Sequence, residues 1–427
     1  MTVPVIIAVQ GEREAVVAAA LGGQSNTAVA RRCADLSEAL AAGHAGLGAV
    51  VVVSDQPQLN RAVVHEFTSA GVAVVGAPSS PEAADRLLDL GLAHVVADPM
   101  DSEAVVAAVL EAADDAPEPD EVAEDIALVS PDGPRGLMVA VVGPTGAPGR
   151  TTVAINLAAE LGALSGNAVV VDVDTYGGAV APALGLMDEA PGIAALARGA
   201  LHGNLTDELI ARHALAVRPG LRVLSGISRP DRWPELTPAA LDPVWDRLRD
   251  HAAVTVVDAG FGLEQDEELV YDTRAPQRHG ATLSALAAAD VVVVVGSAEP
   301  VSIQRLVQTL DQIDAVSTQD SAERVVVVNR VRAAVAGMRP EEAVADALRR
   351  FAGVDEVWTV PFDAKACDAA TLAGQVLAER SPRSSVRKAI AALARHLHTR
   401  VPAAQGAPPG EVADRRDSRA LAADLTD

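Results

Sequence analysis

The stretch LMVAVVGPTGAPGRTTVAINLAAELGAL, residues 137–164, decides the fold of most of this chain. It begins with six consecutive apolar residues, which is typical of a strand buried on both faces of a parallel sheet. It ends with an amphipathic run that predicts a helix. A glycine-rich turn from Gly143 to Thr152 lies between the two. Because such a turn directs backbone N–H groups and the positive end of a helix toward one point, the stretch predicts an anion-binding site.

The end of this turn resembles a phosphate-binding loop, in which the last residues are Gly-Lys-Ser/Thr. The corresponding residues here are Gly149, Arg150 and Thr151. Thr151 is expected to offer its hydroxyl to Mg²⁺, and Arg150 stands where a lysine usually reaches the phosphates. Arginine keeps the positive charge, but its planar fork is larger than an ammonium group. Phosphate binding is therefore expected to survive more readily than hydrolysis, and an ordinary strand-to-helix turn is the alternative interpretation of this segment alone.

Apolar and helix-like segments alternate along the rest of the chain and predict an α/β protein with two domains. In residues 1–115 the expected strands cover residues 3–9, 27–31, 48–53, 72–75 and 94–97, which indicates a flavodoxin-like, parallel sheet. In residues 136–400 they cover residues 137–142, 168–173, 222–224, 254–257, 291–295, 324–328 and 357–361, which indicates a doubly wound, mostly parallel sheet. Residues 116–135 are expected to form an acidic linker, and residues 401–427 a disordered tail.

Composition excludes several classes of function. The chain has 427 residues and a formal net charge of −24, which argues against a general binder of DNA because phosphate neutralisation needs clustered basic residues. Aromatic residues make up only 2%, too few for platforms on which bases stack. Two cysteines, Cys33 and Cys367, form neither a disulfide framework nor a set of zinc ligands. With no apolar run long enough to span a bilayer and no signal peptide, a cytoplasmic location is expected.

Residues 137–397 resemble the MinD/ParA family of P-loop ATPases, whose loop reads K-G-G-x-G-K-T-T. The corresponding residues, 145–152, read TGAPGRTT, so both lysines of that loop are replaced. The resemblance implies binding of ATP with Mg²⁺ and a homodimer formed across the nucleotide. Thr145 aligns with the lysine that reaches the phosphates of the partner subunit in the family, and hydrolysis, if present, is expected to be slow. The residues implied in cofactor binding by the loop are Gly143, Thr145, Gly146, Ala147, Pro148, Gly149, Arg150, Thr151 and Thr152.

Further motifs follow in the order of that family. VVVDVDTYGG carries Asp172 and Asp174 and resembles a switch segment, in which the second acid orients the attacking water. VTVVDAG ends a strand with Asp258, which resembles the aspartate that holds Mg²⁺ through water. The resemblance implies that Thr151, Asp172 and Asp258 hold the metal and that Asp174 and Arg150 act in catalysis. Each acid taken alone has an ordinary turn as its alternative interpretation.

Two residues are implied at the nucleotide base. Asn329 of the segment VVVVNRV stands where the family contacts adenine, and Pro361 of the segment VPFD ends a later strand near the base. Both follow apolar strands, so they are expected at the same edge of the sheet as the phosphate loop.

The first 115 residues resemble a response-regulator receiver that has lost its chemistry. Asp55 stands near the position of a phosphoacceptor, but residues 8–11 read AVQG, where an acidic pair would hold Mg²⁺. A receiver-like domain joined to a MinD-like ATPase is the arrangement of the CpaE/TadZ branch, and the composition resembles that of actinobacterial proteins. The branch implies a factor that localises pilus or secretion assembly, or septum placement, at a pole or septum, with partners recruited by the first domain. A nucleotide-free scaffold and a chromosome-partitioning ATPase remain as alternatives.

Two charged segments leave their roles open. Residues 262–280 carry clustered acids followed by Arg274 and Arg278, which we hypothesise to replace the missing lysine charge; a solvated loop is the alternative. Residues 384–397 predict a basic amphipathic helix, interpreted as the last helix of the second sheet, with binding to anionic lipid as the alternative. Membrane contact is expected to be at most indirect.

Overall fold

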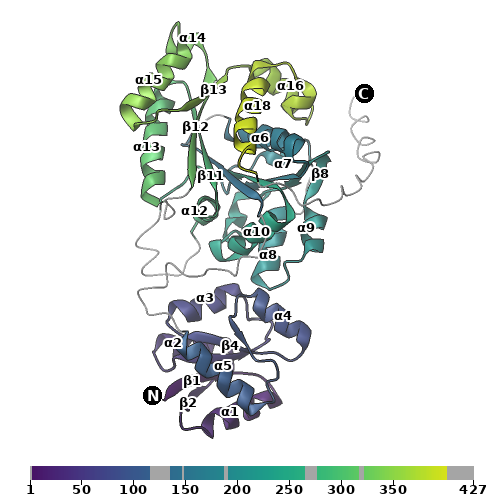
Figure 1. The fold of residues 1–427 in the computed structure, drawn as a ribbon, viewed down its shortest axis with the longest axis vertical. Helices are drawn as coiled ribbons and strands as arrows, with labels where there is room; N and C mark the ends of the chain where they lie inside the picture. Colours follow the sequence, from purple (N-terminus) through teal and green to yellow (C-terminus); the bar gives the residue numbers. More distant parts are fainter. Residues whose placement is uncertain are drawn as a thin grey trace.

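A computed structural model describes residues 2–115, 135–146, 149–186, 191–264, 277–316 and 322–401, which form two parallel-type sheets covered by helices (Figure 1). Several predictions lie outside the described residues: Ala147 and Pro148 of the loop, residues 116–134 of the linker, Arg274 with its acidic neighbours, and residues 402–427 of the tail. The prediction of an α/β chain with two sheets is confirmed.

The first sheet has five parallel strands in the order β2-β1-β3-β4-β5, which is the flavodoxin-like order. Its strands are β1 (Val3–Ala8), β2 (Thr27–Arg32), β3 (Val50–Ser54), β4 (Ala73–Ala77) and β5 (His94–Val95). Two helices cover one face and three cover the other: α1 (Glu12–Gly22) and α5 (Ser102–Asp114), then α2 (Leu36–His44), α3 (Arg61–Ser69) and α4 (Pro81–Asp89). Both faces are buried because β1, β3 and β4 consist almost entirely of apolar residues.

The second sheet has eight strands in the order β13-β12-β11-β6-β10-β7-β9-β8. Its strands are β6 (Leu137–Val142), β7 (Ala168–Val173), β8 (Leu215–Arg218), β9 (Leu221–Leu224), β10 (Val254–Ala259), β11 (Val291–Ser297), β12 (Glu323–Val331) and β13 (Val357–Pro361). All described pairings are parallel except that of β8 with β9. Strand β8 was not predicted, because an edge strand of four residues is too short to show a pattern of its own.

Helices lie on both faces of this sheet, as the doubly wound prediction requires (Figure 1). One group includes α8 (Gly192–Leu201), α9 (Asp207–His213), the 3-10 helix η1 (Pro230–Glu235), α10 (Pro238–His251), α12 (Gly280–Ala287), α13 (Pro300–Val316) and α15 (Pro340–Ala352). The other includes α6 (Arg150–Ser165), α7 (Val180–Ala183), α16 (Ala364–Leu372), α17 (Leu377–Arg380) and α18 (Ser385–His398). The short α14 (Ala333–Ala336) precedes α15.

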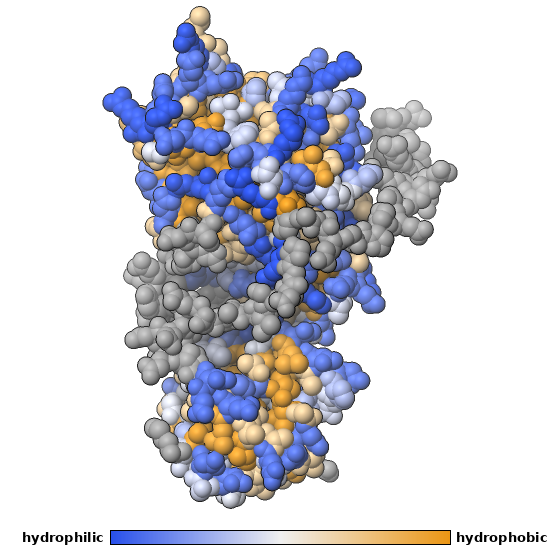
Figure 2. Space-filling model, in the orientation of Figure 1, coloured by the Kyte–Doolittle hydropathy of each residue, from blue (hydrophilic) through white to orange (hydrophobic). Residues whose placement is uncertain are grey.

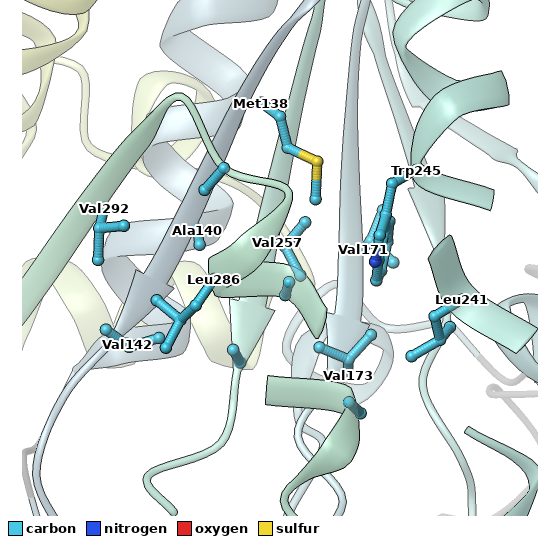
Figure 3. Close-up of a cluster of buried hydrophobic side chains, with 14 of the residues drawn as sticks. Met138, Ala140, Val142, Val171, Val173, Leu241, Trp245, Val257, Leu286 and Val292 are labelled. Atoms are coloured by element: carbon cyan, nitrogen blue, oxygen red, sulfur yellow. The ribbon is translucent and has the colours of Figure 1, made fainter. Parts of the chain in front are cut away.

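The core on the first of these faces is built around Trp245 of α10, which packs against β-strand residues such as Val171 and Val257 (Figure 3). The ring is 1% exposed, and its Nε1 donates a hydrogen bond of 2.7 Å to Ser284 Oγ. A buried indole with a satisfied N–H contributes a large apolar area without the cost of an orphaned donor. Packing of Trp245 therefore stabilises one face of the sheet that carries the candidate site.

Helix α18 covers the opposite face, against α6. Its apolar residues Val386, Ile390, Leu393 and Leu397 are all buried, and the Arg387 guanidinium makes two hydrogen bonds to the Glu160 carboxylate, at 2.6 and 2.9 Å. The interpretation of this segment as the last helix of the sheet is confirmed. Within the described part of the chain, no helix combines the length and the apolar character needed to cross a bilayer.

The unit of the first sheet meets the unit of the second sheet at α4, among other places. Arg86 Nε donates to the carbonyl oxygen of His202 in the second unit at 2.9 Å, while Nη2 of the same residue donates to the carbonyl of Leu59 within the first unit at 2.8 Å. In Figure 1, α3 and α4 of the first unit face α8 and α10 of the second.

Candidate functional site

The candidate site lies at the carboxyl edge of the second sheet, where β6 is flanked by β10 and β11. Asp258 of β10 pairs in register with Asp172 of β7, and Ser297 of β11 pairs with Asn329 of β12. Parallel strands bring these polar residues to one edge although they are far apart in sequence. In doubly wound sheets this edge is where ligands bind.

The glycine loop after β6 runs so close to neighbouring strands that side chains are excluded. A Cβ on Gly143 would lie 2.1 Å from the carbonyl oxygen of Val295, and a Cβ on Gly149 would lie 2.1 Å from Asn329 Nδ2. Gly149 also has φ +103°, a conformation that L residues rarely adopt. Helix α6 begins at the next residue, Arg150, so its N-terminal N–H groups face the loop.

Replacing Gly149 by alanine should destabilise the ligand-free protein by about 3 kcal/mol, the combined cost of a positive φ and of moving the Asn329 side chain. Urea unfolding of the full chain measures this loss. Gly177→Ala is the matched control, because no atom lies within 4 Å of the Cβ it would add and its φ is not positive. Equal stabilities for the two variants would contradict the tight contact between the loop and β12.

Thr151 and Asp258 form the core of the candidate metal site. The Thr151 hydroxyl donates a hydrogen bond of 2.6 Å to Asp258 Oδ2. Asp258 is 1% exposed, and its Oδ1 has no hydrogen-bond partner among the described residues. Burial, followed by the nearby charge of Asp172, raises the pKa of the Asp258 carboxyl well above its usual range.

These groups fit Mg²⁺. Hydroxyl and carboxylate oxygens are the ligands that this ion prefers, and it usually keeps several waters beside one or two protein ligands. Among the described residues, no three His, Cys, Asp or Glu side chains cluster as metal ligands. A divalent cation would also offset the unfavourable burial of the Asp258 charge.

Asp172 organises the loop after β7. Its Oδ1 accepts from the backbone N–H of Asp174 at 3.1 Å, and its Oδ2 accepts from that of Val180 at 3.0 Å. Burial raises the pKa of this carboxyl to about 6, although the backbone hydrogen bonds oppose that rise. Unlike Asp258, both of its oxygens already have partners, so its geometry supports a role in shaping the loop more than a role as a metal ligand.

Arg150 and Asp174, the two residues implied in catalysis, lie together and bind each other. Arg150 Nη2 is 3.0 Å from Asp174 Oδ2, and its Nη1 donates to the carbonyl oxygen of Gly143 at 3.1 Å. Asp174 Oδ1 accepts from the backbone N–H groups of Tyr176 and Gly177. The guanidinium that replaces the loop lysine is thus neutralised in this arrangement, and it must exchange Asp174 for phosphate in order to bind an anion.

A cluster around Tyr176 borders this pair and was missed by the sequence analysis. The Tyr176 hydroxyl lies 2.8 Å from His279 Nε2, and its ring centroid lies 4.7 Å from that of Phe261. The Arg278 guanidinium carbon lies 3.8 Å from the centroid of the same ring. Arg278, hypothesised to replace the missing lysine charge, is therefore engaged by the Tyr176 ring. Residues 103 apart in sequence carry no local signal of such contacts.

The remaining described site residues also reach this edge. Asn329 is 8% exposed and packs on Gly149; its Oδ1 accepts from the backbone N–H of Arg330, which has φ +56°. Pro361 ends β13 and pairs with Val331. Thr152 lies in the first turn of α6, and Gly146 has φ +72°. The Thr145 carbonyl accepts from Arg305 Nη1 at 3.1 Å, a contact that the sequence analysis did not anticipate.

In the first sheet unit, Asp55 is held by its own surroundings. Arg13 Nη1 lies 3.1 Å from Asp55 Oδ1 and donates to the carbonyl of Ala77 at 2.8 Å. The Ser79 hydroxyl donates to the other oxygen of the Asp55 carboxylate. The Asp55 carboxylate therefore has a guanidinium and a hydroxyl as its partners within this unit.

Comparisons with known proteins agree with the fold of the second sheet. The family model described as the CobQ/CobB/MinD/ParA nucleotide binding domain matches residues 139–372. No curated protein matches the chain. Among solved structures, the ParA family ATPase from Chlorobium tepidum TLS is 17% identical, covers 62% of this chain and 100% of its own, and has a TM-score of 0.52.

Two archaeal structures are also similar. The cell division ATPase MinD of Pyrococcus furiosus is 21% identical, with coverage of 62% of this chain and 99% of its own and a TM-score of 0.48. The septum site-determining protein MinD of Pyrococcus horikoshii OT3, solved with Mg-ADP, is 18% identical, with coverage of 61% and 96% and a TM-score of 0.48. At 17% identity, the similarity to the ParA family ATPase shows a shared fold and nothing more.

Proposed function

Because this chain belongs to the CobQ/CobB/MinD/ParA family of nucleotide-binding domains, we propose that it binds ATP with Mg²⁺ at the loop from Gly143 to Thr152 and acts as a positional switch. The observation that carries the proposal is the unpartnered Oδ1 of buried Asp258 beside the Thr151 hydroxyl. A buried carboxylate oxygen that has no hydrogen-bond partner and lies at the ligand-binding edge of a sheet can bind a cation.

Each described residue then has a defined role. Backbone N–H groups of the loop and of the first turn of α6 would hold the phosphates, and Mg²⁺ would neutralise part of their charge when bound. Thr151 and Asp258 would hold the ion. Asp172 would fix the loop after β7, so that Asp174 can orient water or release Arg150 toward phosphate. Asn329 and Pro361 would border the base.

The finer part of the proposal is a role like that of the CpaE/TadZ branch. The ATP-bound chain would form a homodimer across the nucleotide, and the first sheet unit would recruit pilus, secretion or division proteins. The contact of Asp55 with Arg13 supports docking over phosphotransfer by that unit. Figure 2 shows hydrophobic side chains gathered on the visible face of this lower part of the molecule, as a docking surface requires. We propose a cytoplasmic protein recruited to a pole or septum.

A nucleotide-free scaffold is the second candidate. The observation in its favour is the ion pair between Arg150 and Asp174, which satisfies the loop cation without any ligand. In that case the protein would bind its partners through its surface, and the loop would bind no nucleotide. A chromosome-partitioning role is disfavoured by the net charge of −24.

Isothermal titration of the full chain with ATP, in the presence and absence of Mg²⁺, tests the proposal. We expect saturable heat with Mg²⁺ and a rise in the unfolding temperature of several degrees at ligand concentrations well above Kd. Thr151→Ala should weaken binding only when Mg²⁺ is present. Absence of heat and of any thermal shift would favour the scaffold, and a salt-sensitive gel shift with DNA of arbitrary sequence would favour the partitioning role.

A further inference from the structure

The phosphate loop lacks a cation that is free to meet an anion. Thr145 and Gly146 are uncharged, Arg150 is paired with Asp174 at 3.0 Å, and Arg278 is stacked on Tyr176. A triphosphate carries several negative charges, and N–H groups of the backbone alone leave most of them without a counter-charge. Exchange of Asp174 for phosphate would make the one charge of Arg150 available, and a triphosphate can bind a further cation from another part of the chain.

Arg305 of α13 is a cation from outside the loop that contacts the loop directly. Its Nη1 donates to the carbonyl oxygen of Thr145 at 3.1 Å and lies 3.0 Å from the point where a Cβ on Gly146 would sit. The residue is exposed, and no carboxylate of the described residues lies within ion-pair distance of it. By contrast, Arg332 at the same edge of the sheet is paired with Glu299 at 2.9 Å.

We propose that Arg305 binds the terminal phosphates of the nucleotide held by its own loop and adds its positive charge to that of Arg150. This inference rests on the proposed function. A guanidinium has five N–H groups, and the contact with Thr145 uses one of them. The remaining donors can form paired hydrogen bonds with phosphate oxygens.

The contact with Thr145 also gives the residue a specificity role. Arg305 contacts the loop at Thr145 and Gly146, whereas Asn329, proposed to border the base, packs on Gly149. The charge of Arg305 is therefore expected to act on the phosphates farther from the base. Loss of this charge should weaken ATP more than ADP. The ligand class is thus a nucleoside triphosphate, selected over a diphosphate by the cation on α13.

The experiment compares the full-length wild type with Arg305→Ala and Arg305→Lys by isothermal titration with Mg-ATP and Mg-ADP. We expect Arg305→Ala to weaken ATP about tenfold to a hundredfold, the effect of a charge-assisted hydrogen bond, and ADP by clearly less. Arg305→Lys should retain part of the affinity. Arg324→Ala is the matched control, because Arg324 is paired with Asp314 at the opposite edge of the sheet and should not affect either ligand.

The outcomes separate the inference from the function on which it rests. If the wild type binds ATP and Arg305→Ala binds it equally well, the inference is overturned and the proposed function stands. If the variant keeps its affinity but loses ATP-dependent dimerisation in light scattering, the contact is made to a second copy and our assignment is wrong. If the wild type binds no nucleotide, the proposed function fails and the inference fails with it.

Discussion

Replacing Asp258 by asparagine is expected to stabilise the ligand-free protein by about 2 kcal/mol at neutral pH and to remove the dependence of ATP binding on Mg²⁺. The wild-type carboxyl is 1% exposed and leaves Oδ1 without a partner among the described residues, so its ionised form pays a large desolvation cost. Asparagine keeps an oxygen for the Thr151 hydroxyl but carries no charge. The same change removes the carboxylate that would hold the ion, and titration with and without Mg²⁺ measures this second effect.

The gain in stability should depend on pH with a definite sign. A carboxyl whose pKa is raised by folding destabilises the folded state as soon as the unfolded chain begins to lose that proton, at a pH of about 4. Below that pH both states are protonated and the variant should gain little. The difference in the free energy of unfolding between Asp258→Asn and the wild type should therefore grow from about pH 4 toward neutral pH. Asp172 has a pKa of about 6, so it also lowers the stability of the wild type as the pH rises from about 4 to about 6.

Thr255→Val is the matched control on the same strand. Thr255 is also 1% exposed, and its Oγ1 likewise has no partner among the described residues, but it lies three residues before Asp258, away from the loop. Its replacement should stabilise the protein without any pH dependence and without any effect on Mg-ATP. A Mg²⁺ effect that persists in Asp258→Asn would show that the metal is held elsewhere.

The fold could be predicted because its strands carry their own signal. The runs LMVAVV and AVVVDV are long, apolar and bounded by turn residues, so the predicted bounds of β6 and β7 agree with the structure. Strands β10, β11 and β12 were found but extend two or three residues beyond the prediction, because polar residues such as Asp258, Ser297 and Asn329 continue the pairing. Those residues belong to the candidate site, so the apolar pattern of these strands ends before the strands themselves do.

The pairings within the site could not be predicted from the sequence. The loop spacing placed Arg150 and Thr151 at the start of a helix, and the strand-end rule placed Asp174 and Asp258 at the same edge. Which acid each loop residue meets depends on strand order: β10 lies between β6 and β7, so Thr151 reaches Asp258, whereas the longer Arg150 reaches Asp174. Arg305 lies 160 residues from Thr145, and no local pattern marks that contact.

Replacing Arg150 by alanine is expected to have the largest effect on ATP affinity, a loss of at least a hundredfold, together with a loss of about 3 kcal/mol in stability. The stability loss arises because the Asp174 carboxylate, 6% exposed, is left without its counter-charge. The loss of affinity arises because Arg150 is the cation of the loop itself, and it can exchange Asp174 for phosphate when a nucleotide enters. Urea unfolding and titration with Mg-ATP measure the two effects separately.

A double variant separates the two roles of Arg150. Arg150→Ala with Asp174→Asn removes both charges of the pair, so most of the lost stability should return while ATP affinity stays low. Arg150→Lys keeps a cation beside Asp174 and should bind ATP within about tenfold of the wild type, because a lysine can still meet phosphate as a point charge. If the double variant regains wild-type affinity, Arg150 serves only as the counter-charge of Asp174. The phosphates would then be held by the backbone N–H groups of the loop together with a cation from elsewhere in the chain, and Arg305 is placed to be that cation.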